Sequence, residues 1–137
     1  MAVRSLESVE GAVHESARRR KILVIDDEPT LTKVMRRMLA AHQVTTVNSV
    51  PEALELIVAG ERYDVIISDL LMPGMSGMDL HERMQELAPD QVAKIVFMTG
   101  GAVTERARAF FDQVPNPMLE KPFDKQALLS LIDGLVQ

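Results

Sequence analysis

Residues 21–29 read KILVIDDEP, an apolar and β-branched run that ends in three consecutive acids and a proline. A continuous apolar run of this length is typical of a strand that is buried on both faces of a parallel sheet. Three carboxylates at the end of a buried strand repel one another, unless their pKa values rise or a cation neutralises them. The stretch therefore predicts a buried parallel strand with a charged site at its end.

The same strand-then-helix pattern continues along the chain. Four more strand-like runs, each followed by helical spacing or a helix-start signal, are QVTTV (43–47), DVIISD (64–69), KIVFMT (94–99) and a short run near Pro117–Glu120. Five such units predict an α/β fold, a single three-layer domain with helices on both faces of a parallel sheet. We expect the last strand at a sheet edge, because the nitrogen of Pro117 cannot donate to a ladder.

Two helix starts are marked by capping signals. Ser49 and Glu52 have the spacing of a capping box, in which each residue's side chain accepts a hydrogen bond from the other's backbone N–H. Ser76 is the predicted cap of the helix after the third strand, with Asp79 three residues later. These signals predict where two of the helices begin.

Composition limits the class of protein. The chain has 137 residues, of which 47% are hydrophobic and 26% charged, and this suits one folded domain. It has no cysteine, which excludes disulfides and thiolate sites and fits a reducing cytoplasm. We expect a cytoplasmic protein without a membrane span, because no apolar run is long enough and no secretory signal is present. The net charge of −5 argues against direct binding of nucleic acid.

Polar groups collect where the predicted strands end, which is where ligands bind in open α/β sheets. They are Asp26, Asp27 and Glu28 after the first strand, Asp69 at the end of the third, Thr99 at the end of the fourth and Lys121 after the fifth. Taken singly, each residue is better explained as a helix cap, a turn residue or a surface charge. Together at one rim they indicate a specific site.

The residue types indicate the chemistry of that site. Oxygen ligands without a nearby histidine or cysteine favour Mg²⁺, or Mn²⁺, over zinc. A lysine and a hydroxyl beside such an ion suit the charge of a phosphoryl group, and a carboxylate there can act as the nucleophile. The pattern predicts metal-assisted phosphoryl transfer onto an aspartate.

At these residues the chain resembles a response-regulator receiver domain of the CheY-like family. The resemblance runs from about residue 21 to 136 and rests on VIDDEP (24–29), SDLLMPGMSG (68–77), FMTGG (97–101) and LEKPF (119–123). It implies a flavodoxin-like, doubly wound (βα)5 sheet in the strand order 2-1-3-4-5. It also implies two-component signalling, with a sensor histidine kinase or a phosphotransfer protein as phosphoryl donor. Residues 21–137 would then be the receiver domain, and residues 1–20 an N-terminal tail or linker.

The resemblance also implies roles for single residues. They are Asp69 as phosphoacceptor; Asp26, Asp27, Asp69 and the backbone carbonyl of Leu71 as Mg²⁺ ligands; Thr99 as the switch hydroxyl; and Lys121, before a cis proline, as the lysine that bridges the phosphoryl group. The protein would catalyse only its own phosphorylation and dephosphorylation and would not be an enzyme toward other substrates. Leu71 and Gly101 flank the expected phosphoryl group, where they can tune its lifetime.

One position departs from the family. Met118 stands where receivers usually carry a tyrosine or phenylalanine, and methionine cannot donate a hydrogen bond. We expect either a weaker or altered readout of phosphorylation, or ordinary apolar packing at this position. His42 and His81 lie away from the strand ends, and His81 is predicted to face solvent.

Several functions stay open. The chain can be a free-standing regulator that switches a downstream protein partner; no further domain follows the last helix, so we expect no appended DNA-binding domain. It can also be the C-terminal receiver of a hybrid sensor histidine kinase in a phosphorelay. A haloacid-dehalogenase-like phosphatase is disfavoured, because it would need Asp-x-Asp where this chain has Asp26-Asp27. The complete set of site residues argues against a degenerate scaffold, and a phosphorylation-linked dimer stays open.

Overall fold

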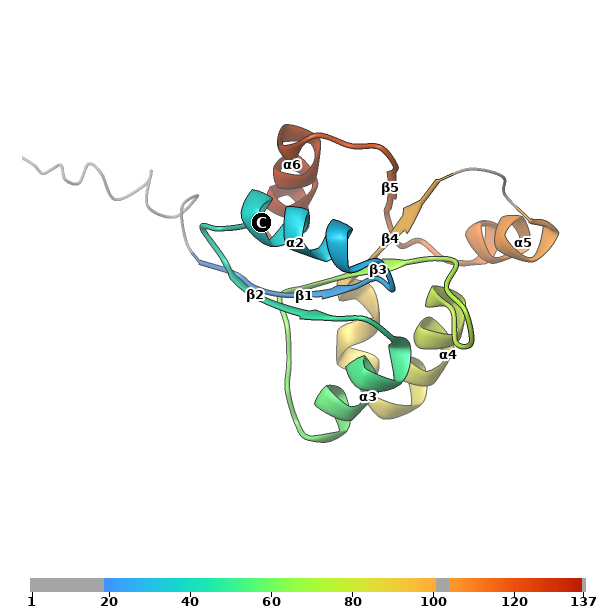
Figure 1. Cartoon of the computed structure of the whole chain (residues 1–137). Coiled ribbons are helices and arrows are strands. Elements are labelled where there is room, and N and C mark those ends of the chain that lie inside the picture. Colours follow the sequence, from blue (N-terminus) through green and yellow to red (C-terminus); the bar gives the residue numbers. More distant parts are fainter. Residues whose placement is uncertain (1–18, 101–103, 137) are drawn as a thin grey trace, which may run out of the picture.

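A five-stranded parallel sheet forms the centre of the molecule, in the order β2-β1-β3-β4-β5. The computed structural model describes residues 19–100 and 104–136 (Figure 1). The strands are β1 (Lys21–Ile25), β2 (Gln43–Val47), β3 (Val65–Asp69), β4 (Ile95–Thr99) and β5 (Met118–Glu120). The predicted fold class and strand order are confirmed, and β5 lies at the sheet edge as expected. Strands β3, β4 and β5 each start one residue later than predicted.

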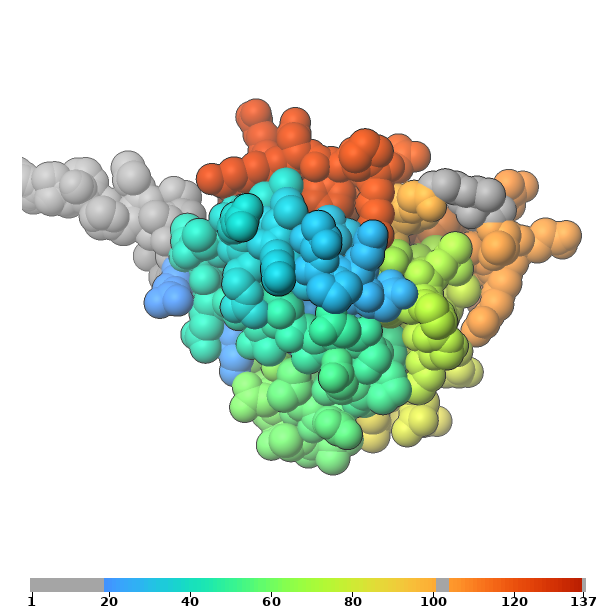
Figure 2. Space-filling model, in the orientation of Figure 1, coloured from blue at the N-terminus to red at the C-terminus, as the bar shows by residue number. Residues whose placement is uncertain are grey.

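Helices cover both faces of the sheet and give three layers (Figure 1). They are α2 (Pro29–Met38), α3 (Val50–Val58), α4 (Gly77–Leu87), α5 (Glu105–Gln113) and α6 (Lys125–Leu135), with a 3₁₀ helix, η2 (Pro89–Lys94), before β4. Helices α2 and α6 pack on one face, and α3, α4 and α5 contribute to the core on the other. In the space-filling view, α2 covers the front, with α6 above it and α3 below (Figure 2).

Strand β1 is buried on both sides, because its alternate side chains enter different cores. Ile22 and Val24 pack under α2 and α6, whereas Leu23 and Ile25 belong to the core under α3 and α4, and all four are 0% exposed. Complete burial of such a side chain contributes about 1.5–3 kcal/mol. This apolar strand carries the acids that follow it into the middle of the sheet's carboxyl edge.

Both predicted helix caps are present, with one difference in geometry. The Ser76 N–H donates to the Asp79 carboxylate at 2.8 Å, and the Asp79 N–H donates to the Ser76 Oγ at 3.3 Å, which completes a capping box. Ser49 accepts from the Glu52 N–H, but the Glu52 carboxylate accepts from the N–H of Asn48 and not from that of Ser49. The start of α3 is thereby joined to the end of β2.

The prediction that His81 faces solvent is wrong. Its side chain is only 6% exposed and lies on the inner side of α4, one turn after Gly77. The His81 ring meets Phe110 edge to face at a centroid distance of 5.3 Å and lies 6.2 Å from Phe97. Burial lowers the pKa of His81, and the Asn116 side chain raises it without reversing that effect.

Three further observations complete the fold. Within residues 19–100 and 104–136, no helix is both long enough and apolar enough to cross a membrane. The Lys121–Pro122 peptide bond is cis, as the resemblance implied. Residues 1–18, which include most of the predicted tail, and residues 101–103, which include Gly101, lie outside the described part of the chain.

Candidate functional site

The predicted site residues meet at one edge of the sheet because all the strands run in the same direction. The register pairs Ile25 with Ser68, Asp69 with Met98, and Thr99 with Glu120. The residues that end or follow these strands therefore lie next to one another along the carboxyl edge of the sheet. This is the edge where ligands bind in open α/β sheets.

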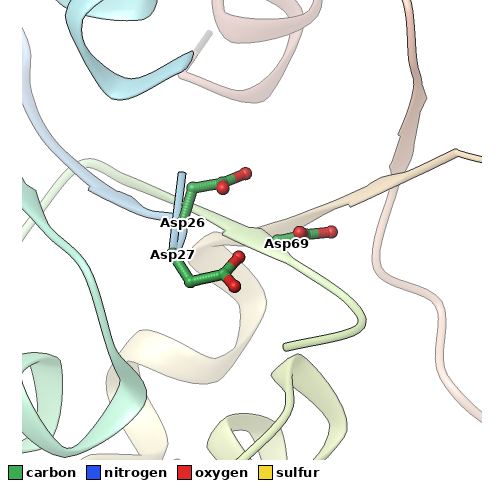
Figure 3. Close-up of side chains that lie close together, drawn as sticks. All are labelled: Asp26, Asp27 and Asp69. Atoms are coloured by element: carbon green, nitrogen blue, oxygen red, sulfur yellow. The ribbon is translucent and has the colours of Figure 1, made fainter. Parts of the chain in front are cut away.

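Three carboxylates form the centre of this edge. Asp26 and Asp27 follow β1, Asp69 ends β3, and one carboxylate oxygen of each lies within 4.8 Å of the others (Figure 3). Two unit charges at such a distance repel by about 3–4 kcal/mol at an effective dielectric constant near 20. Asp26 is 1% exposed, and the Asp69 side chain is 14% exposed, whereas Asp27 is open to solvent. The cluster thus needs a positive charge.

Lys121 supplies part of that charge. Its Nζ lies 3.3 Å from an Asp26 oxygen and 3.4 Å from an Asp69 oxygen, with a side chain that is 25% exposed. Burial alone would lower the pKa of Lys121, but the charges of Asp69 and Asp26 outweigh it, and the pKa is raised. The ammonium group is therefore charged at neutral pH and connects the end of β1 to the end of β3.

One lysine does not neutralise three carboxylates, and the pKa of Asp69 is raised. Burial raises the pKa of Asp69, and the Asp26 charge raises it further, although Lys121 and the backbone N–H of Leu71 act in the opposite direction. Asp26 has both carboxylate oxygens engaged, one by Lys121 and the other by the Glu28 N–H at 2.9 Å. The remaining charge and the all-oxygen donor set of the three aspartates fit a hard divalent cation such as Mg²⁺.

Other predicted residues are less directly connected. Thr99 ends β4, and its backbone carbonyl accepts from the Lys121 N–H at 2.7 Å, so the two residues are held side by side. The Leu71 side chain is 43% exposed beside the site. Met118 begins β5 and packs, partly buried, on the core under α3 and α4. Glu28 occupies the N-cap position of α2 without a side-chain capping bond, and it is outside the acid cluster.

Sequence reasoning missed three residues that shape the site. A Cβ on Gly77 would lie 2.6 Å from the Asp69 carbonyl oxygen, and a Cβ on Gly100 would lie 3.0 Å from the Lys121 Cβ. The Asn48 side-chain amide donates to the Asp26 carbonyl at 3.0 Å. Gly77 and Gly100 stand in two of the segments that carry the family resemblance, SDLLMPGMSG and FMTGG, whereas Asn48 has no sequence signal beyond its place between a predicted strand and a predicted helix cap.

Comparisons with known proteins bear on the family and the fold of the chain. A family model described as the response regulator receiver domain matches residues 22–133. The transcriptional regulatory protein GlrR of Escherichia coli (strain K12) is 32% identical over 118 residues, or 85% of this chain. Because the alignment covers only 26% of GlrR, the chain spans about a quarter of that protein.

Two solved structures are similar along nearly their whole length. A response regulator receiver domain protein from Clostridium thermocellum superposes with a TM-score of 0.74 at 30% identity, covering 85% of this chain and 93% of that one. The signal receiver domain of a signal transduction histidine kinase from Syntrophus aciditrophicus gives a TM-score of 0.75 at 26% identity, covering 85% and 89%.

Proposed function

The chain belongs to the response regulator receiver domain family, and we propose that it accepts a phosphoryl group on Asp69 in a Mg²⁺-dependent reaction. The observation that carries this proposal is the position of Asp69, beside the carboxylates of Asp26 and Asp27 and 3.4 Å from the Lys121 ammonium. Receivers of this family are signalling domains of two-component systems. The residue assignments and the reaction are the proposal.

In the proposed step, an ionised Asp69 oxygen attacks the phosphorus of a phosphohistidine. A new P–O bond forms on Asp69 while the P–N bond breaks, and the donor imidazole keeps the electron pair and takes up a proton from solvent. Lys121 is within reach of Asp69 and stabilises the negative charge on the phosphoryl oxygens. Asp26, Asp27, Asp69 and the Leu71 carbonyl would hold Mg²⁺, which when bound would offset the charge of the acids and of the phosphoryl group.

Thr99 and Met118 are the proposed links from the site to partners. Thr99 is held next to Lys121, from where its hydroxyl can approach the phosphoryl group. Met118 has no hydroxyl and no ring, and we expect the readout through α5, β5 and α6 to be weaker or altered. Its packing on the core is equally compatible with an apolar role alone.

The donor in this proposal is a sensor histidine kinase or a phosphotransfer protein, and the output is binding of a downstream protein. A place within a longer hybrid histidine kinase is the second candidate, favoured by the similarity to the receiver of the Syntrophus aciditrophicus kinase. A cytoplasmic location is part of the proposal, in keeping with the absence of cysteine. Direct nucleic-acid binding is not part of the proposal, because the net charge of −5 disfavours contact with a phosphate backbone.

The test is phosphorylation by a small donor. Protein incubated with Mg²⁺ and acetyl phosphate is expected to gain one phosphoryl group in the intact mass spectrum. Asp69→Asn should abolish the adduct, whereas Asp112→Asn, a change at an exposed position of α5, should leave it unchanged. An adduct that persists in Asp69→Asn would contradict the assignment. Repeated hydrolysis of an added phosphomonoester would favour the phosphatase instead.

A further inference from the structure

In the sheet, β2 ends beside the acidic stretch that follows β1, and the last hydrogen bond between these two segments is donated by a side chain. The parallel pairing of β1 with β2 finishes at Ile25 and Val47. The Asp26 N–H then donates to the Val47 carbonyl at 3.2 Å. In a continued parallel ladder, the Asp26 carbonyl would accept from the N–H of Ser49.

A side-chain amide takes the place of that backbone donor. Ser49 is the N-cap of α3, and the chain turns away into the helix there. The Asn48 Nδ2 donates to the Asp26 carbonyl at 3.0 Å. Both backbone polar groups of Asp26 are thus bound by two consecutive residues at the end of β2. The ladder is extended by one rung beyond the strand.

Asn48 is itself held in place by the first turn of α3. Its backbone N–H donates to the Glu52 carboxylate at 2.8 Å, and the Glu52 N–H donates to the Ser49 Oγ at 3.3 Å. The Asn48 amide therefore projects from a capped helix start. A donor anchored in this way can fix the direction of the group to which it binds.

The Asp26 carbonyl belongs to the peptide bond that joins Asp26 to Asp27. The orientation of this peptide plane determines how the two side chains are directed relative to each other. Lys121 and the Glu28 N–H already hold the buried Asp26 carboxylate, whereas Asp27 is exposed. A fixed orientation of this peptide plane therefore restricts the backbone of Asp27 as well as that of Asp26.

We propose that Asn48 is a positioning residue that fixes the Asp26–Asp27 peptide plane and so prepares both carboxylates for a divalent cation. This inference rests on the proposed function, since it concerns the same Mg²⁺ site. A neutral amide suits the position, because it donates a hydrogen bond without adding charge to the acids. Outer contacts that orient metal ligands contribute to metal affinity.

The test compares Asn48→Ala with Gln43→Ala, which removes an amide from an exposed position at the other end of the same strand. Isothermal titration calorimetry measures the Mg²⁺ dissociation constant, and NMR relaxation of the metal-free protein measures the order parameter of the Asp27 N–H, which lies in the same peptide plane as the Asp26 carbonyl. Asn48→Ala is expected to weaken Mg²⁺ binding about 3- to 10-fold and to lower the order parameter of the Asp27 N–H below the value of about 0.85 that is typical of rigid backbone. Gln43→Ala should match the wild type in both.

Unchanged Mg²⁺ affinity in Asn48→Ala would overturn the inference, even if its melting temperature falls, because a purely structural role lowers stability alone. A wild-type protein that binds no Mg²⁺ would instead contradict the proposed function. In that case the order parameter of the Asp27 N–H still decides whether Asn48 orders the Asp26–Asp27 peptide, because equal values in the variant and the wild type would refute that role.

Discussion

Gly77, the first residue of α4, lies close to the end of β3, and Gly77→Ala tests whether that close approach is required. A Cβ there would lie 2.6 Å from the Asp69 carbonyl oxygen, 3.1 Å from the Leu70 Cα and 3.3 Å from Phe97. The first two are backbone atoms of β3 and of the residue after it, so no flexible side chain can yield. The start of α4 or the end of β3 must move by several tenths of an ångström.

We expect Gly77→Ala to lower the free energy of unfolding by about 1–3 kcal/mol, the usual cost of overpacking a core. Gly77 is the first residue of α4, so little gain in helix propensity offsets this cost. Because the displaced atoms include the Asp69 backbone, phosphorylation by acetyl phosphate should also slow in the fraction that remains folded. Urea denaturation measures the first effect, and the rate of adduct formation measures the second.

Gly134→Ala is the matched control. Gly134 lies within α6, and a Cβ added there would meet no atom within 4 Å. The same substitution should therefore raise stability, by about 0.5–1 kcal/mol, since alanine favours a helix over glycine. If Gly77→Ala were as stable as the wild type or as Gly134→Ala, the close packing of α4 against β3 would not be the constraint described here.

Three other predictions concern charge and readout. Burial lowers the pKa of His81, so its contribution to stability is complete above the unfolded pKa of about 6.5 and is lost as the pH falls from there through the folded pKa. Urea denaturation between pH 7.5 and pH 5, about the range where histidine titrates, should therefore show a smaller loss of unfolding free energy for His81→Leu than for the wild type. Lys121 lowers the pKa of Asp69, so Lys121→Met should raise that pKa further in a carbon-13 NMR titration and slow phosphorylation, whereas an unchanged pKa would contradict the ion pair. Met118→Tyr should change coupling to the kinase or the strength of output, and equal values in both would leave Met118 as apolar packing.

The predicted elements matched the structure because their signals are local. Alternation of apolar runs and helical spacing depends on neighbours along the chain, and burial of β1 on both faces produces a continuous apolar run such as KILVI. The strand order was not contained in these patterns and came from the resemblance to receivers. Given parallel strands, the meeting of Asp26, Asp69 and Lys121 at one edge followed without knowledge of any distance.

His81 shows why side-chain burial was harder to predict. Its exposure depends on Phe110 in α5, whose position along the chain says nothing of its distance from α4. The approach of Gly77 to Asp69 and the bond from Asn48 to Asp26 likewise join residues on different elements. No periodicity of a single helix or strand reports such contacts.

Local pattern was therefore sufficient for the class of fold and for the bounds of the strands to within one residue. Three-dimensional packing was needed to show that Lys121 bridges Asp26 and Asp69 and that α4 lies against β3 at Gly77. It was also needed to show that the Asn48 side-chain amide donates to the backbone carbonyl of Asp26. The physical reason is the range of the interactions. Periodicity and capping act over a few residues, whereas the charges and contacts of the site act between chain segments that folding alone brings together.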